Sequence, residues 1–217
     1  MADLDIIKQI EQEIGRKLRQ ISLDKVTSHP RKNGYAVDEN NNVIGLNLDK
    51  SNLYTIPHSL SSLKNLQKLS LYDSKIEQLP DSFAQLQNLS ELDLSNNELK
   101  ELPASFGQLQ NLSELWLSNN KLKELPASFG QLQNLSELDL SNNELKELPA
   151  SFRKLQNLCY LNLRDNQLKK LPVSFGKLKK LQKLILKSNC LEVLSEDLGL
   201  LKKLTFLDLK YNKLRRL

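Results

Sequence analysis

The side chains that most often carry out catalysis are scarce in this sequence of 217 residues. It contains two histidines, His29 and His58, and two cysteines, Cys159 and Cys190. A catalytic triad needs a nucleophile, a base and an orienting group, and neither histidine has a spacing to Ser, Cys or Asp that suggests one. The sequence therefore predicts no enzyme activity, and we interpret the cysteines as free structural thiols.

Carboxylates recur in the middle of the chain, where Glu91, Glu114 and Glu137 stand 23 residues apart. Ca²⁺ takes six to eight convergent oxygen ligands, whereas carboxylates on neighbouring strands form a flat row. The sequence also lacks the G-x-x-x-x-G-K-S/T loop that cradles the phosphates of a nucleotide. We expect neither a metal nor a cofactor, and the question becomes which elements place these side chains.

A repeat organises most of the chain. From Val43 onward the pattern LxxLxLxxNxLxxLPxxFxxLxN returns every 23 residues. Residues 88–110 and 111–133 differ only where Asp93 becomes Trp116 and Glu98 becomes Lys121. Eight frames result, the last one incomplete, and they open at Val43, Leu66, Leu89, Leu112, Leu135, Leu158, Leu181 and Leu204.

These recurring residues make residues 43–217 resemble the leucine-rich repeat family. The resemblance implies an α/β fold, a horseshoe-shaped solenoid with an inner parallel β-sheet. It also implies that the asparagine at the ninth position of each frame forms hydrogen bonds to the neighbouring turn, so that these residues make a ladder of bonds along the solenoid. The ladder should be weaker at the start, where Ser51 and Ser74 replace the asparagine. The asparagines that carry this role over are Asn97, Asn120, Asn143, Asn166, Asn189 and Asn212.

Residues 1–42 are expected to cap the front of the solenoid. Apolar residues at helical spacing predict an amphipathic helix over residues 4–21. A hairpin should follow, with Tyr35–Val37, a turn at Asp38–Asn42 and a strand from Val43. This segment resembles the amino-terminal cap of prokaryotic Roco proteins, which implies a downstream GTPase domain. Because the sequence stops inside a repeat, we also expect a longer parent chain or self-association through the uncovered last repeat.

The third and fifth positions of each frame should face outward on the concave side of the sheet. Trp116, the single tryptophan, should stand at the middle of that face, ringed by acidic residues. An exposed tryptophan of this kind anchors interfaces, although recently duplicated repeats also copy their surfaces passively. The candidate partner-binding residues are Glu91, Asp93, Glu114, Trp116, Glu137, Asp139, Tyr160, Arg164, Lys183, Lys187 and Phe206.

Charge is unevenly distributed along the chain. Residues 89–157 hold ten acidic and six basic residues, a net −4, whereas residues 158–217 hold five and fourteen, a net +9. We therefore expect a basic protein segment at the Trp-centred concave face, and an acidic surface or a downstream domain at the basic end. Nucleic acid and anionic membrane are less favoured partners for that end.

The sequence thus predicts a regulatory or scaffolding protein-binding module, in the setting of a Roco-like GTPase signalling protein. One alternative is a free-standing bacterial recognition protein or effector whose basic end binds nucleic acid or membrane. Another is an engineered, consensus-like repeat protein. The acidic start lacks the features of a signal peptide, and no apolar run approaches the roughly 18–20 residues of a membrane span. We therefore expect a cytoplasmic location.

Overall fold

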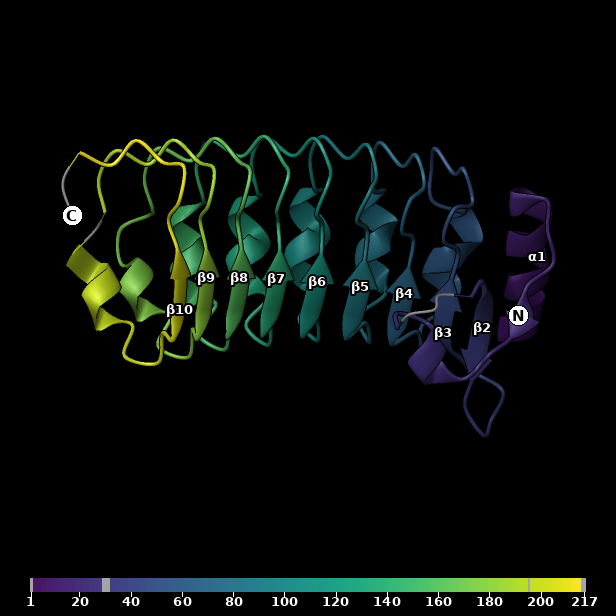
Figure 1. Ribbon diagram of the computed structural model, residues 1–217. Helices are drawn as coiled ribbons and strands as arrows, with labels where there is room; N and C mark the ends of the chain where they lie inside the picture. The colour runs from purple at the N-terminus through teal and green to yellow at the C-terminus, as the bar shows by residue number, and fades with distance from the viewer. Residues whose placement is uncertain (1, 29–31, 195, 216–217) are drawn as a thin grey trace.

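The computed structural model describes residues 2–28, 32–194 and 196–215. Within them a single ten-stranded sheet forms, and its strands are ordered as in the sequence. Figure 1 shows the strands side by side along the molecule, with short helices packed behind one face of the sheet. The opposite face corresponds to the concave face of the expected horseshoe, and we keep that name for it.

The strands recur at 23-residue steps from β4 to β10, which pair in parallel. Each of the strands β3 to β9 is followed by one turn or more of 3-10 helix, in the segment that returns the chain to the start of the next strand. The strands are β1 (Arg19–Gln20), β2 (Gly34–Val37), β3 (Val43–Asn47), β4 (Lys68–Ser70), β5 (Glu91–Asp93), β6 (Glu114–Trp116), β7 (Glu137–Asp139), β8 (Tyr160–Asn162), β9 (Lys183–Ile185) and β10 (Phe206–Asp208). The 3-10 helices are η1 (Leu23–Lys25), η2 (His58–Ser62), η3 (Asp81–Gln85), η4 (Ala104–Gln108), η5 (Ala127–Gln131), η6 (Ala150–Lys154), η7 (Phe175–Lys177) and η8 (Glu196–Leu200).

The cap contains the expected helix and hairpin, but the helix is shorter than the apolar spacing predicts. Helix α1 (Asp3–Ile14) ends at Gly15, which adopts a left-handed conformation with φ of 67°. The chain then turns into β1, which pairs in parallel with β2. Leu18, which continues the apolar spacing beyond Gly15, is buried although it lies outside the helix. Its apolar character therefore reflects the packing of an extended segment and not of a helix.

The hairpin joins β2 and β3 in antiparallel register and attaches the cap to the repeats. Its turn is held by Asp38, whose carboxylate accepts hydrogen bonds from the backbone N–H groups of Asn40 and Asn42 at 2.9 Å each. The expected hairpin cap is therefore confirmed.

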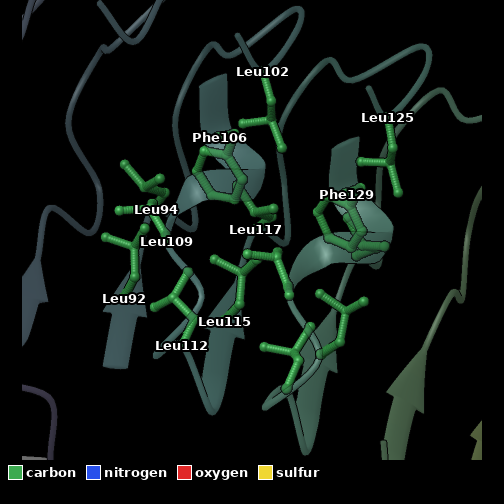
Figure 2. Close-up of a cluster of buried hydrophobic side chains, with 14 of the residues drawn as sticks. Leu92, Leu94, Leu102, Phe106, Leu109, Leu112, Leu115, Leu117, Leu125 and Phe129 are labelled. Atoms are coloured by element: carbon green, nitrogen blue, oxygen red, sulfur yellow. The ribbon is translucent and has the colours of Figure 1, made fainter. Parts of the chain in front are cut away.

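Leucines fill the space between the sheet and the arcs, because alternate side chains of each strand point to the same face. Figure 2 shows Leu92, Leu115 and Phe106 directed into this core. Four phenylalanines, Phe106, Phe129, Phe152 and Phe175, stack in one column. The ring centroids of Phe106 and Phe129 are 6.3 Å apart with an interplanar angle of 4°. One repeat therefore buries its apolar side chains only against the next.

The ninth-position asparagines bond successive turns, as Asn143 illustrates. Its Nδ2 donates to the carbonyl of Leu117 at 2.9 Å, and its Oδ1 accepts the N–H of Leu122 at 3.0 Å. At the start of the solenoid the ladder is incomplete, because the buried Ser74 Oγ has no partner among the described residues.

A second asparagine ladder, which the sequence analysis missed, runs along the loops that lead into the strands. Asn111 Nδ2 donates to the carbonyl of Gln87 at 2.8 Å, and Asn134 Nδ2 to that of Gln110 at 2.9 Å. The signal was present, because an asparagine stands directly before the first residue of each of the first six frames, and a lysine does so in the last two. In the middle of the solenoid, neighbouring repeats are thus tied to each other on both sides of the strand.

Candidate partner-binding surface

The strand pairing places the third residue of each repeat in one continuous column on the concave face. Lys68 is aligned with Glu91, then with Glu114, Glu137 and Tyr160. The column continues through Lys183 to Phe206. The sequence-predicted acidic and basic residues are therefore brought together on one surface, in the order that the sequence analysis expected.

The fifth residues form a second column, but their carboxylates are engaged by the backbone. Asp93 Oδ1 accepts the N–H of Ser95 at 2.8 Å, and Asp139 Oδ1 accepts the N–H of Ser141 at 2.8 Å. Asp and Asn are suited to this bond to the residue two positions on. These side chains therefore stabilise the turn that follows each strand, a role that the sequence analysis did not assign to them.

Trp116 occupies this second column in β6 and is half-buried, less exposed than the sequence analysis expected. The indole nitrogen only donates hydrogen bonds, so Trp116 cannot accept the N–H of Ser118 as an aspartate would. The local fold thus favours Asp or Asn at this position. Trp116 therefore lacks this bond, as does Ile185 at the same position in β9, whereas the two neighbouring strands of Trp116 keep it through Asp93 and Asp139.

The beginning of the concave face is covered, which the sequence analysis did not foresee. The segment from Leu23 to Thr27, here called the covering segment, lies over β3: Asn47 Nδ2 donates to the carbonyl of Val26 at 2.7 Å. Its far end reaches β5, where Thr27 Oγ1 donates to Glu91 Oε2 at 2.7 Å. Asp93, expected to ring the tryptophan as an exposed carboxylate, is only 1% exposed.

Gly45 shows how closely the covering segment packs. A Cβ atom at this position would lie 2.7 Å from Val26 Cγ2 and 2.8 Å from Leu23 Cδ1. Two carbon atoms that are not bonded to each other do not approach this closely. Glycine, which has no Cβ, therefore leaves room for the covering segment. A glycine in place of the outward-facing residues of later repeats was the sequence signal for this cover.

The three glutamates of the first column differ in whether a lysine is paired with the carboxylate. Glu91 pairs with Lys68 at 2.5 Å. For the next member, Glu114, burial raises the pKa of the carboxyl above its usual value, and the neighbouring charges of Glu91 and Glu137 raise it further. Glu137 itself is exposed. The centre of the face therefore carries negative charge that a bound cation would stabilise.

Tyr160 continues the column beyond the glutamates. Burial raises the pKa of its phenol, and Asp139 and Glu137 add to the effect. The Nζ of Lys183 lies 5.3 Å from the ring centroid of Tyr160 and 5.2 Å from that of Phe206. This geometry is a cation–π contact on both sides of the lysine.

Two more predicted basic residues lie on the same part of the face. Lys187 Nζ lies 5.3 Å from the ring centroid of Tyr211. Arg164 Nε donates to Oδ2 of Asp165, the next residue in the chain, at 2.7 Å. This bond holds the guanidinium group close to the end of β8. The C-terminal part of the concave face is thus a mixed surface of cations and aromatic rings.

The last repeat exposes side chains that earlier repeats bury. Leu207 in β10 is 40% exposed, whereas its counterpart Leu184 in β9 is fully buried. The neighbouring Phe206 is 47% exposed. No repeat packs on this side of β10 in the described residues, so its apolar side chains face outward.

Residues 2–28, 32–194 and 196–215 hold neither a metal-binding cluster nor a helix that could span a membrane. They contain no group of three or more His, Cys, Asp or Glu side chains placed to hold a metal ion. Cys159 and Cys190 are free thiols. His29 lies outside the described residues. None of the described helices has the length and apolar character needed to cross a membrane.

Comparison with protein-family models matches two descriptions to the chain. A model described as a leucine-rich repeat region matches residues 114–216, and one described as a leucine rich repeat matches residues 41–99 and 64–122. The matches support this family and nothing narrower, so the resemblance of the cap to Roco proteins stays a prediction. A search of curated proteins gave no match.

Solved structures of similar architecture come from bacteria and a plant. A leucine-rich repeat protein of Leptospira interrogans is 39% identical over 76% of this chain and 42% of its own, with a TM-score of 0.74. The ectodomain of the Arabidopsis thaliana receptor kinase GASSHO1/SCHENGEN3, solved in complex with Casparian strip integrity factor 2, is 33% identical over 74% of this chain and 20% of its own, with a TM-score of 0.68.

An internalin, InlF of Listeria monocytogenes, matches 99% of this chain and 58% of its own with a TM-score of 0.72. At 19% identity this likeness concerns the fold alone, the cap included. The present chain spans 42%, 20% and 58% of the lengths of these three structures.

Proposed function

Because the chain belongs to the leucine-rich repeat family, whose repeat domains generally bind proteins, we propose that it takes up an extended, positively charged partner segment on its concave face. The binding site is centred on Trp116, between Glu114 and Glu137. Its N-terminal boundary is the covering segment, which occupies the face as far as Glu91. The site continues toward Tyr160 and Lys183.

The observation that carries this proposal is the presence of Trp116 where the turn favours Asp or Asn. The two flanking repeats, which are otherwise almost identical, keep Asp93 and Asp139 and their bonds to the backbone. A half-exposed indole that gives up such a bond is better explained by a contact with a partner than by the needs of the fold. Tryptophan is also among the residues that most often dominate interface energies.

The charge around Trp116 supports a cationic partner. The pKa of Glu114 is raised because its carboxylate is partly buried beside two other glutamates. A lysine or arginine of a partner would remove this repulsion, and an arginine would also stack on the indole. The solved complex of the Arabidopsis ectodomain with Casparian strip integrity factor 2 gives a precedent for capture of a protein ligand by a related repeat domain.

Fluorescence of Trp116 tests the proposal directly, because it is the single tryptophan. We expect a short peptide in which arginine alternates with glycine to shift its emission, and the matching glutamate peptide to leave it unchanged. With a labelled arginine peptide, Trp116→Ala should cost about 2 kcal/mol of binding free energy, roughly a thirtyfold loss of affinity.

A matched pair of glutamates controls for charge. Glu137→Gln should weaken binding, whereas Glu147→Gln, exposed on a loop outside the concave face, should not. Equal affinity of the Trp116→Ala variant and the parent protein for the arginine peptide would refute the proposal. The tryptophan would then be a passive difference between duplicated repeats.

From the resemblance of the cap alone, we further propose that the module belongs to a cytoplasmic, Roco-like signalling protein. The coding sequence that follows the codon of Leu217 tests this. A P-loop and GTPase core there would support it, and any other reading would refute it.

A further inference from the structure

A second charged surface lies outside the concave face, on the loops that lead from η6 and η7 into the next strands. An open depression of about 500 Å³ is lined here by Lys154, Lys177, Lys179 and Lys180. The side chains of Gln133, Gln156 and Asn157 complete its lining. We call this surface the basic rim.

The fold does not require lysine at these positions, as the earlier repeats show. Lys154 and Lys177 stand where η4 and η5 end in Gln108 and Gln131. Lys179 likewise stands one repeat after Gln156. Three repeats with neutral amides adopt the same loop, so the change to lysine serves something other than folding.

Lys180 replaces an asparagine of the second ladder and keeps part of its role. Its Nζ donates to Asn157 Oδ1 at 2.7 Å. The Nζ of Lys179 donates to the carbonyl of Leu200 at 3.2 Å. Two of the four ammonium groups are therefore held in place by neutral acceptors and not by carboxylates.

Within the described residues, no carboxylate pairs with the charge of the basic rim, since none of its four lysines forms an ion pair there. Like charges gathered around one depression repel each other, and an anionic partner would relieve this repulsion. We propose that the basic rim docks an acidic segment of a protein, rich in glutamate or aspartate.

The lining of the depression favours carboxylates over other polyanions. A surface for single-stranded nucleic acid usually offers aromatic rings for base stacking, and a membrane-binding surface offers apolar side chains for insertion. The depression has neither, since lysines and amides are its whole lining. The three amides can donate to and accept from a peptide backbone, which an acidic segment would present between its carboxylates.

The test compares two triple variants with the same change in net charge. The rim variant combines Lys154→Gln, Lys177→Gln and Lys179→Gln, which restores residues that earlier repeats carry at these positions. The control variant combines Lys123→Gln, Lys146→Gln and Lys169→Gln, three exposed lysines on the loops that follow the strands. The probe is a labelled poly-glutamate peptide at low ionic strength.

We expect the rim variant to bind poly-glutamate at least tenfold more weakly and the control variant less than about twofold more weakly. Trp116→Ala should leave this binding unchanged, so the result is independent of the function proposed for the concave face. Equal losses in the two triple variants would overturn the proposal. So would tighter, rim-dependent binding of a single-stranded oligonucleotide or of phosphatidylserine vesicles, which would assign the surface to those partners.

Discussion

The two ends of the concave face are built from the same backbone and differ in what lies on them. In β3 to β5 the fifth residues Asn47, Ser70 and Asp93 are at most 1% exposed. In β6 to β9 the corresponding residues, Trp116 and Ile185 among them, are half-buried. The covering segment lies on the first of these regions, where it contacts β3 and reaches Glu91. A regular repeat thus fixes the backbone of a binding surface but not how much of it is accessible.

The most disruptive way to erase this difference is to detach the covering segment. Val26 is fully buried against the face, so Val26→Asp would place a charge without a partner in an apolar contact. We expect a loss of about 3 kcal/mol in the free energy of unfolding, with faster cleavage after Lys25 by a lysine-specific protease. Val173→Asp is the control, because Val173 is 81% exposed. Equal losses in the two variants would mean that the segment adds nothing to stability.

The asparagine ladder offers a second way to compare the two regions. Asn120→Ser in the middle of the solenoid should cost about 2 kcal/mol, because it leaves buried backbone groups without partners. Ser74→Asn near the start should instead raise the free energy of unfolding by about 1 kcal/mol, because it supplies the missing rung. Urea denaturation measures both. A loss of stability in the Ser74→Asn variant would show that the cap excludes an asparagine there.

A smaller effect is expected at the open end, where Lys183 lies between two aromatic rings. Lys183→Met keeps the length of the side chain and removes its charge. It should lower the free energy of unfolding by about 0.5–1 kcal/mol if the cation–π contacts contribute. The same substitution at Lys146, which is exposed on a loop, should change stability little. An unchanged free energy of unfolding in the Lys183→Met variant would assign no energy to these contacts.

The smallest effect concerns pH at the centre of the face. The folded-state pKa of Glu114 is raised, so this group favours the folded state at low pH. That contribution is lost as the pH rises through the raised pKa. Glu114→Gln should therefore have the higher melting temperature at neutral pH, and the difference should vanish below about pH 4. A lower melting temperature at neutral pH would show that the carboxylate is stabilised instead.

The sequence predicts well those structural features that the 23-residue repeat determines. The register of Glu91, Glu114 and Glu137 follows from the repeat, since each position meets its own copy in the next strand. The covering segment could not be predicted this way, because residues 23–27 belong to no repeat and their partners lie up to 64 positions away. The apolar spacing also predicted a helix up to residue 21, but the helix ends at Gly15, which adopts a left-handed conformation.

The near-identity of residues 88–110 and 111–133 also has a genetic consequence. Both blocks meet their neighbours through equivalent asparagine bonds and stacked phenylalanines. In-frame recombination between their coding copies would thus remove or duplicate one unit while both new junctions stay intact. Loss of the unit with Trp116 would delete the proposed anchor in a single event and leave a foldable, shorter domain. Duplication would place two tryptophans on adjacent strands, so a change in length would also change the number of proposed anchors.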